Sequence, residues 1–177
     1  MKIAFLSSRF PPDFIGGGEW STKMIAEGMV ALGHDVHVFC GAEKNAEEKI
    51  NGVMVKRLSA LYGLWDKPLF EKKKSSALAG ELKEYLGKDF DVVHAHDFRS
   101  ALTLAMLDLD NSFVTVRDFA PICGTTNNMW FDGRSCDGCS WGNILLRCHR
   151  VKEASLPRKP FRIWQYKYNL SFRNHAY

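Results

Sequence analysis

The sequence predicts an α/β domain in which a parallel sheet carries helices on both faces. Short apolar runs of strand length alternate with segments of helical spacing over residues 2–116. A cluster of three glycines joins the first apolar run to the first helical segment. The 177 residues, 46% of them hydrophobic, suffice for the core of one domain. Right-handed crossovers place such a glycine loop at the carboxyl edge of the sheet, where open α/β folds bind ligands.

The first predicted unit consists of a strand, a loop, a helix and a second strand. The two strands are the apolar runs Lys2–Ser7 and Val36–Cys40. Gly33 ends the helix between them, because glycine adopts the left-handed cap conformation without steric cost. The apolar residues of this helix recur at helical spacing and predict its apolar face: Trp20, Met24, Gly28 and Leu32, with Ile25 and Met29 beside them.

Further strands and helices alternate after this unit. Residues 41–52 are charged and predict a mobile connection rather than a strand. The elements expected next are a strand at Val53–Leu58, an aromatic loop at Leu61–Pro68, a helix at Leu69–Leu86 closed by Gly87, a strand at Asp91–Ala95, a helix at Ser100–Leu107 and a strand at Phe113–Val116. Residues 121–160 lack periodicity, and residues 161–177 predict a last helix.

The glycine cluster, Gly16, Gly17 and Gly18, matches neither common phosphate-binding loop. The segment SSRFPPDFI separates it from the strand, and no Gly-Lys-Ser/Thr follows. One interpretation is a flexible turn without a ligand. The other is a loop whose bare backbone lets a polar ligand approach a helix N-terminus. Glu19 then either complements the helix dipole or accepts hydrogen bonds from sugar hydroxyls.

Polar residues close the strand predicted at 91–95. His94 and His96 share one face, because strand side chains alternate. We interpret His94 as a satisfied core histidine, whereas His96 and Asp97 are candidate ligand contacts. Arg117 and Asp118 follow the strand predicted at 113–116, and Arg9 follows the first strand as another cation at this edge. A surface charge is the alternative for Arg9, and a cap or salt-bridge partner is the alternative for Asp118.

Four of the five cysteines lie in the aperiodic segment. Cys123, Cys136, Cys139 and Cys148 form a C-x12-C-x2-C-x8-C pattern. The two-residue spacing of Cys136 and Cys139 lets both sulfurs face one tetrahedral centre. Zinc and an iron–sulfur cluster both suit four thiolates, and four protein ligands would make the site structural. Disulfides and unpaired, reduced thiols are the alternatives. Cys40, at a strand end, is expected in the core.

Charge and composition limit the expected location and binding partners of the protein. The net charge is +4, but residues 147–177 hold eight Lys or Arg against Glu153 alone, a net charge of +7. Phe161, Trp164 and other aromatic residues share this basic segment. A peripheral contact with anionic lipid is one interpretation, and a helix that buries its aromatics is the other. The sequence has no long apolar run and no signal-peptide layout, which predicts a cytoplasmic protein. No nucleic-acid-binding motif is present.

Three stretches together resemble the amino-terminal domain of retaining glycosyltransferases of family 4, which have the GT-B fold. The first runs from the prolines through GGGE to LGHDVHVF, with Gly33–Val36 matching the family's entry to the second strand. The second is DVVHAHD, residues 91–97, and the third is FVTVRDF, residues 113–119. The resemblance implies one Rossmann-like acceptor-side domain over residues 1–177, with a cysteine-rich insertion at 121–160. It also implies that the donor-binding domain lies outside this chain.

The resemblance assigns roles to the residues at the sheet edge. Arg117 and Asp118 are the expected catalytic pair, where the family usually has His-Asp and its histidine touches the donor sugar. Arginine cannot act as a base, but it can bind phosphate or carboxylate, so an anionic acceptor is one consequence. The remaining expected substrate contacts are Gly17, Gly18, Glu19, His96, Asp97 and Arg9.

The activity implied by the resemblance is sugar transfer from a nucleotide-sugar donor to a hydroxyl acceptor, with retention and without a catalytic metal. The acceptor is expected to be a carbohydrate, a lipid-linked molecule or another hydroxyl compound. The 177-residue chain alone is expected to be inactive. The alternative is a metal-stapled nucleotide-binding or interaction module without catalysis of its own.

Overall fold

A six-stranded sheet forms the centre of the first of two units in the computed structural model. The model describes residues 1–13, 16–65, 71–86, 89–123, 132–146, 148 and 159–176. The first unit comprises Met1–Pro68 with Lys73–Arg117, and the second comprises Leu69–Lys72 with Asp118–Tyr177. The strands are β1 (Lys2–Ser7), β2 (Asp35–Gly41), β3 (Ala46–Ile50), β4 (Val53–Leu58), β5 (Val92–Ala95) and β6 (Ser112–Val114).

The strand order is β3-β4-β2-β1-β5-β6. All neighbouring strands pair in parallel except β3, which lies antiparallel to β4 at one edge. The five parallel strands therefore follow the doubly wound order in which the chain starts at the middle of the sheet and builds outward in both directions. This arrangement confirms the predicted α/β fold class with a Rossmann-like sheet.

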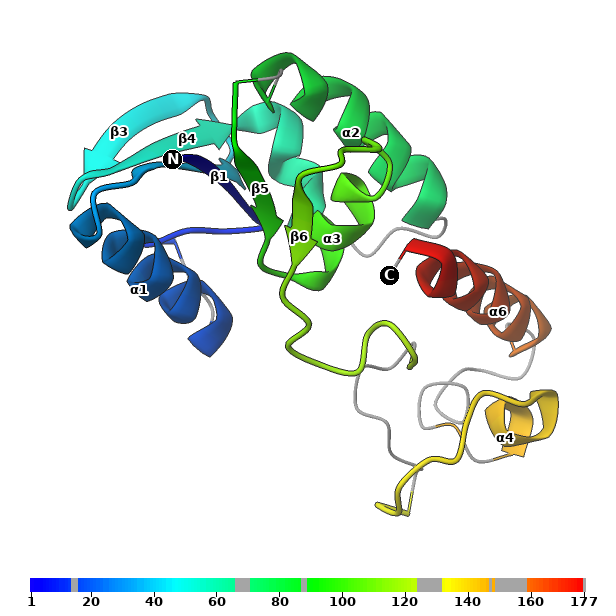
Figure 1. The fold of residues 1–177 in the computed structure, drawn as a ribbon. Coiled ribbons are helices and arrows are strands. Elements are labelled where there is room, and N and C mark those ends of the chain that lie inside the picture. The colour runs from blue at the N-terminus through cyan, green and yellow to red at the C-terminus, as the bar shows by residue number, and fades with distance from the viewer. Residues whose placement is uncertain are drawn as a thin grey trace. The chain divides into compact units, whose positions relative to one another are not determined.

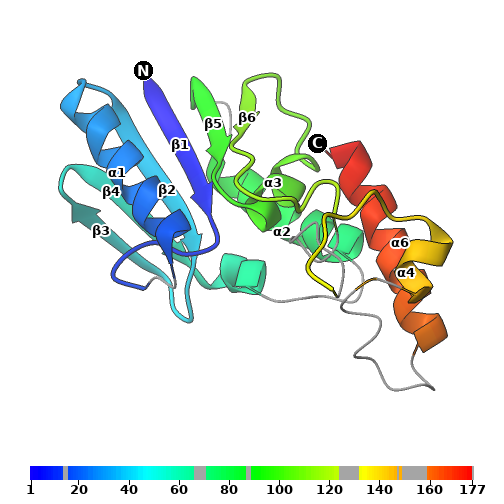
Figure 2. The ribbon, with the colours of Figure 1, turned by 90° about the horizontal axis from the view of Figure 1, so that it is seen from below.

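Helices cover both faces of the sheet, as Figures 1 and 2 show. The helix α1 (Gly17–Ala31) lies on one face. The 3-10 helix η1 (Ser59–Trp65), α2 (Glu71–Leu86) and α3 (Phe98–Leu104) lie on the other. The alternation of β1 supplies both cores, because successive strand side chains point to opposite faces. Ile3 and Phe5 join the α1 side, whereas Ala4 and Leu6 join the α2 and α3 side.

Two sequence-based predictions about this unit were wrong. Residues 41–52 contain the strand β3, and a tight turn at Asn51 and Gly52, with φ of 49° and 88°, joins it to β4. The buried residues of α1 are Thr22 and Ala26, not the predicted apolar stripe. Met24 and Leu32 are 68% and 75% exposed. Of the predicted apolar residues, Met29 is partly buried and packs against the core on this side of the sheet.

The other element predictions hold within a few residues. Gly33 ends α1 with φ of 85°, as expected for a glycine cap. The predicted aromatic loop at 61–68 begins as η1, with Leu61 and Leu64 fully buried, and its last residues lie outside the described part of the chain. The same is true of Leu69, Phe70 and Gly87, so the helix predicted from 69 is described as α2 from residue 71.

The second unit holds two helices, α4 (Trp141–Leu146) and α6 (Lys159–Ala176). The helix predicted over 161–177 is confirmed as α6, whereas α4 lies in the segment predicted to lack periodic structure. Phe161, Trp164 and Tyr168 form an aromatic ladder on α6 and are 40–49% exposed, while Phe172 is buried. In the described residues, no helix is both long and apolar enough to cross a membrane. Contact of α6 with an anionic membrane stays a prediction.

Candidate functional site

The candidate site lies in the first unit, at the point where the strand order reverses. β1 pairs with β2 on one side and with β5 on the other, so the chain winds away from β1 in both directions. Open α/β folds bind ligands beyond the carboxyl ends of such strands. Ser8 follows β1 here and Asp97 follows β5. The backbone N–H and the Oγ of Ser8 donate to the Asp97 carboxylate at 2.6 and 2.8 Å.

Asp97 is also the N-cap of α3. Its Oδ1 accepts from the backbone N–H groups of Arg99 and Ser100 at 3.1 and 3.0 Å, and its Oδ2 accepts from Ser100 Oγ at 2.8 Å. The two contacts from Ser8 bring further donors to the same two oxygens. These bonds make Asp97 an anchor that fixes the chain after β1 against the start of α3. Direct contact between Asp97 and a substrate stays a prediction.

The rings of the two histidines near the end of β5 lie against each other in a tilted arrangement, with centroids 4.2 Å apart. His94 Nε2 lies 2.8 Å from Thr115 Oγ1, in agreement with a satisfied histidine. His96 is only 1% exposed. Burial first, and then the charges of His94 and Arg117, lower the pKa of His96 to about 3. The imidazole is therefore neutral at physiological pH and reaches a ligand only through its neighbours.

Arg117 links His96 to the glycine loop. Its Nη1 donates to the Gly18 carbonyl at 2.6 Å, and its Nη2 contacts Thr22 Oγ1 at 3.3 Å and His96 Nδ1 at 2.9 Å. A guanidinium only donates, so Nδ1 is the acceptor and the imidazole proton resides on Nε2. In the described part of the chain, His96 Nε2 and Arg117 Nε are buried without hydrogen-bond partners.

The charge of Arg117 persists in this environment. Burial lowers its pKa, and the negative charges of Asp97 and Glu19 oppose that effect. A guanidinium stays protonated at all accessible pH. In the described part of the chain, three of its five N–H groups have protein acceptors, and the N–H on Nε is buried without one. Arg117 is therefore a positive charge held in place by protein contacts.

The glycine loop is open at its surface. A Cβ added at Gly17 would meet nothing within 4 Å, and one added at Gly18 would meet only Arg117 Nη1, at 3.8 Å. Gly16 and Gly17 begin α1, and Glu19 Oε2 accepts from the Gly16 N–H at 3.1 Å. Packing does not require glycine at these positions. Both interpretations of the loop, a turn without a ligand and a backbone that admits one, remain predictions.

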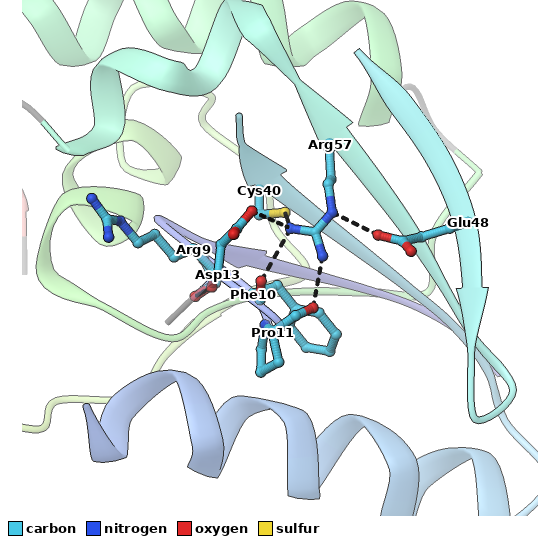
Figure 3. Close-up of polar contacts among 8 residues, drawn as sticks. Arg9, Phe10, Pro11, Asp13, Cys40, Glu48 and Arg57 are labelled. Carbon is cyan, nitrogen blue, oxygen red and sulfur yellow. Dashed lines mark hydrogen bonds and ion pairs between the residues drawn. The ribbon is translucent and has the colours of Figure 1, made fainter. Parts of the chain in front are cut away.

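The residue that organises the approach to this loop is Arg57, which the sequence analysis missed. Figure 3 shows its guanidinium next to Phe10 and Pro11, in the segment that follows β1. Nη1 donates to the Phe10 carbonyl at 3.0 Å, and Nη2 donates to the Pro11 carbonyl at 2.6 Å. Glu48 Oε1 balances the charge, 2.6 Å from Nε, and Asp13 lies 3.7 Å from Nη1.

A signal for Arg57 exists in the sequence. Val53, Val55 and Arg57 alternate along β4, and all three are buried. A charged residue on a buried strand face needs a partner, and its partners here are backbone carbonyls far away in the sequence. Cys40 lies 3.9 Å from the same guanidinium, and burial raises the pKa of its thiol to about 12. The prediction that Cys40 is a core residue is confirmed.

The hydrogen bonds described for two predicted site residues, Arg9 and Asp118, are with nearby residues of the chain. Arg9 follows Ser8, and its side chain points away from the Arg57 contacts in Figure 3. Its carbonyl accepts from Ser7 Oγ at 2.8 Å. Asp118 begins the second unit, and its Oδ1 accepts from the Ala120 N–H at 2.7 Å. Asp118 therefore caps a local turn, and its catalytic role stays a prediction.

The predicted metal ligands all lie in the second unit. None of the five cysteines, each in the described part of the chain, forms a disulfide. Cys123 is buried, and Cys136, Cys139 and Cys148 are partly exposed. Among the described residues, no three His, Cys, Asp or Glu side chains already form a group that could hold a metal ion. Metal binding by these cysteines stays a prediction.

Comparison with known proteins finds similarity to glycosyltransferases. The model of Glycosyltransferase Family 4 matches residues 15–174. Over 103 residues the chain is 35% identical to an uncharacterized glycosyltransferase, MJ1607, of Methanocaldococcus jannaschii. That match covers 55% of this chain and 25% of that protein, so the similarity spans about a quarter of the relative's length.

Proposed function

This chain belongs to glycosyltransferase family 4, and on that premise we propose that the whole protein transfers a sugar from a nucleotide-sugar donor to a hydroxyl acceptor. The anomeric configuration is retained. This domain supplies the acceptor side, and a further domain binds the donor. The protein acts in the cytoplasm. The acceptor is a carbohydrate, a lipid-linked molecule or another hydroxyl compound.

One observation carries the assignment of the acceptor site. The glycine loop and the fixed cation of Arg117 meet at the N-terminus of α1, where the strand order reverses. N–H groups at the start of a helix lack intrahelical partners and favour negative charge. The exposed glycines leave room above them. A hydroxyl compound that carries a phosphate or carboxylate fits this combination.

Each side chain then has a defined task. Arg117 provides positive charge for the anionic group of the acceptor, and its contact with His96 holds the guanidinium in place. The neutral His96 does this without adding a second buried charge. Asp97 and Ser8 fix the two strand ends on which the site rests. In the same way, cations and helix dipoles stabilise the negative charge of the departing diphosphate.

The glycines give the sharpest test of this proposal, because the variants should separate stability from function. Gly17→Ala and Gly18→Ala should raise stability by about 0.5–1 kcal/mol, since alanine favours the helix and meets no clash. In the full-length protein, both should reduce sugar transfer from nucleotide-sugar donors. Gly28→Ala is the matched control in the same helix, because its added Cβ also meets nothing within 4 Å. It should stabilise α1 and leave transfer unchanged.

Two results would overturn the proposal. Equal transfer by all three alanine variants would remove the glycine loop from the site. Absence of transfer by the full-length wild type, across a panel of nucleotide sugars and acceptors, would remove the activity itself. The 177-residue chain alone should show no turnover, because the donor site lies outside it in this proposal.

A further inference from the structure

The second unit has a cluster of thiols that the proposed sugar transfer does not use. We call Cys123, Cys136, Cys139 and Cys148 the cysteine cluster. Cys123 lies before the undescribed residues 124–131, whereas Cys136 and Cys139 lie in the turn that precedes α4. Cys148 follows α4. Three separate segments therefore contribute to the cluster, and its members span 26 residues of sequence.

The helix α6 holds two of these segments by their backbone. Arg173 Nη1 donates to the carbonyls of Ala120 and Cys123 at 3.3 Å each. Lys167 Nζ, on the same helix, donates to the Cys139 carbonyl. Arg173 is itself fixed by a bidentate ion pair with the buried Glu71. The cysteine-bearing segments are thus tied to one rigid element.

The turn around Cys136 and Cys139 is also fixed from within. Asn143 Nδ2 donates to Asp137 Oδ1 at 2.8 Å and to the Gly138 carbonyl at 3.0 Å. Gly138 has φ of 129°, a conformation that side chains rarely adopt. The N–H of Cys148 donates to the Asn143 carbonyl at 2.9 Å, so Asn143 joins the turn to the last cysteine.

Two of the cluster cysteines share one environment, because Cys139 and Cys148 both pack against a small apolar cluster of Ile144 and Ile163. Among the described residues, no three His, Cys, Asp or Glu side chains form a group that could hold a metal ion. Binding would therefore require the cysteine side chains to rearrange around the ion.

We propose that the cysteine cluster binds one zinc ion through four thiolates and that this ion holds the loops of the second unit together. Soft thiolate donors select zinc over hard cations, and the two-residue spacing of Cys136 and Cys139 suits a tetrahedral site. Binding converts four thiols and one Zn²⁺ into a tetrathiolate complex of charge −2 and releases four protons. Lys167, beside Cys139, supplies compensating charge. Four protein ligands leave no position for water, so the site is structural.

Metal analysis of the purified protein tests this proposal without an activity assay. Protein purified under reducing conditions should contain one zinc ion per chain. Cobalt substitution should give the absorption bands of a tetrahedral thiolate complex. Cys136→Ser and Cys139→Ser should each lose the bound metal. Cys40→Ala is the control, because Cys40 is buried in the sheet of the first unit and should not affect the metal content.

A second measurement covers variants that fail to fold. In the wild-type protein, chelation should expose four thiols to alkylation and make α6 sensitive to protease, while the sheet stays intact. Four thiols that react equally with and without bound zinc would overturn the proposal. Disulfides seen as a mass loss under non-reducing conditions, or iron with inorganic sulfide in place of zinc, would also overturn it. None of these outcomes depends on whether the protein transfers a sugar.

Discussion

Different kinds of interaction stabilise the interior of each of the two units of this chain. The first unit buries apolar side chains on both faces of a sheet, with α1 over one core and α2 and α3 over the other. In the described part of the second unit, the apolar cluster has only two buried members, Ile144 and Ile163. Ala120, Leu170 and Phe172 are buried in this unit as well. Its polar connections are prominent, chiefly the Glu71–Arg173 ion pair and the carbonyl contacts made by α6.

The chain is therefore stabilised in two ways, by apolar burial in the first unit and by a few polar contacts in the second. Apolar burial scales with area and tolerates many substitutions of similar volume. Ion pairs depend on a few atoms, so the loss of one partner leaves the other uncompensated. The first unit should therefore respond to changes in side-chain volume, and the second to changes in charge and thiol chemistry.

The largest expected effect comes from the core of the first unit. Phe39 is 1% exposed and packs edge-on against Phe90, with ring centroids 5.8 Å apart. Phe39→Ala should cost about 3–5 kcal/mol, because it removes an aromatic ring and leaves a cavity. Phe113→Ala is the control, since Phe113 is 55% exposed, and it should change stability by no more than about 0.5 kcal/mol. Chemical denaturation followed by circular dichroism measures both. Equal losses would contradict the assignment of the core.

The second unit should respond most strongly to loss of Arg173. Arg173→Met leaves the buried Glu71 carboxylate without its partner, where the two groups are 2.5 Å apart. The cost should be about 3 kcal/mol, and hydrogen exchange should accelerate in α6 but not in the sheet strands. The double variant Glu71→Leu with Arg173→Met should recover much of this loss, because it removes both charges together. Protection of α6 that is unchanged in the single variant would contradict the comparison of the two units.

The same division explains what the sequence predicts well. The strands and helices of the first unit follow from apolar periodicity, which is a local property. β3 was missed because its charged side chains outweighed the Asn51–Gly52 signal, a strong indicator of a hairpin. The predicted buried face of α1 was wrong in part, since Thr22 and Ala26 are buried there and Met29 is the residue of the predicted face that packs against the core.

The site was only partly predictable for a different reason. Residue types at strand ends located Asp97 and Arg117 at the correct edge of the sheet. Their partners could not be inferred, because Ser8 and Asp97 are 89 residues apart and Arg117 and Gly18 are 99 apart. A pattern read along the chain contains no pairing over such distances. The residue pattern therefore placed Arg117 near the glycine loop, but it did not reveal how many of the guanidinium N–H groups already donate to protein atoms.

Arg57 is a charged residue buried in the first unit, which is otherwise stabilised mainly by apolar side chains. Arg57→Met should leave the carbonyls of Phe10 and Pro11 without donors and cost about 2 kcal/mol. Lys56→Met, one position earlier in β4, is the control, because Lys56 is more exposed and its ion pair in the described part of the chain is with Glu47, at 3.6 Å. It should cost less than about 0.5 kcal/mol. Thermal unfolding measures the difference, and equal costs would show that the carbonyl contacts of Arg57 contribute nothing to stability.

Near neutral pH the smallest expected effect is a pH dependence that belongs to the first unit, and this effect grows as the pH falls. His96 has its pKa lowered to about 3 in the folded protein, against an ordinary value of 6.5. Between these values the unfolded chain binds a proton that the folded chain does not, so the free energy of unfolding falls as the pH falls. One such proton gives a slope of about 1.4 kcal/mol per pH unit, and above pH 6.5 this contribution is fully present.

A variant isolates the contribution of His96. His96→Asn keeps an acceptor for Arg117 and cannot titrate, so its stability should depend less on pH between 6.5 and 3 than that of the wild type. His34→Asn is the control, because His34 lies at the opposite end of the sheet, near the N-terminus, and it should leave the slope unchanged. Denaturation midpoints collected across this range test the difference. A wild-type slope that survives His96→Asn would assign the acid sensitivity to other groups, and His94, whose pKa burial also lowers, would be the next residue to replace.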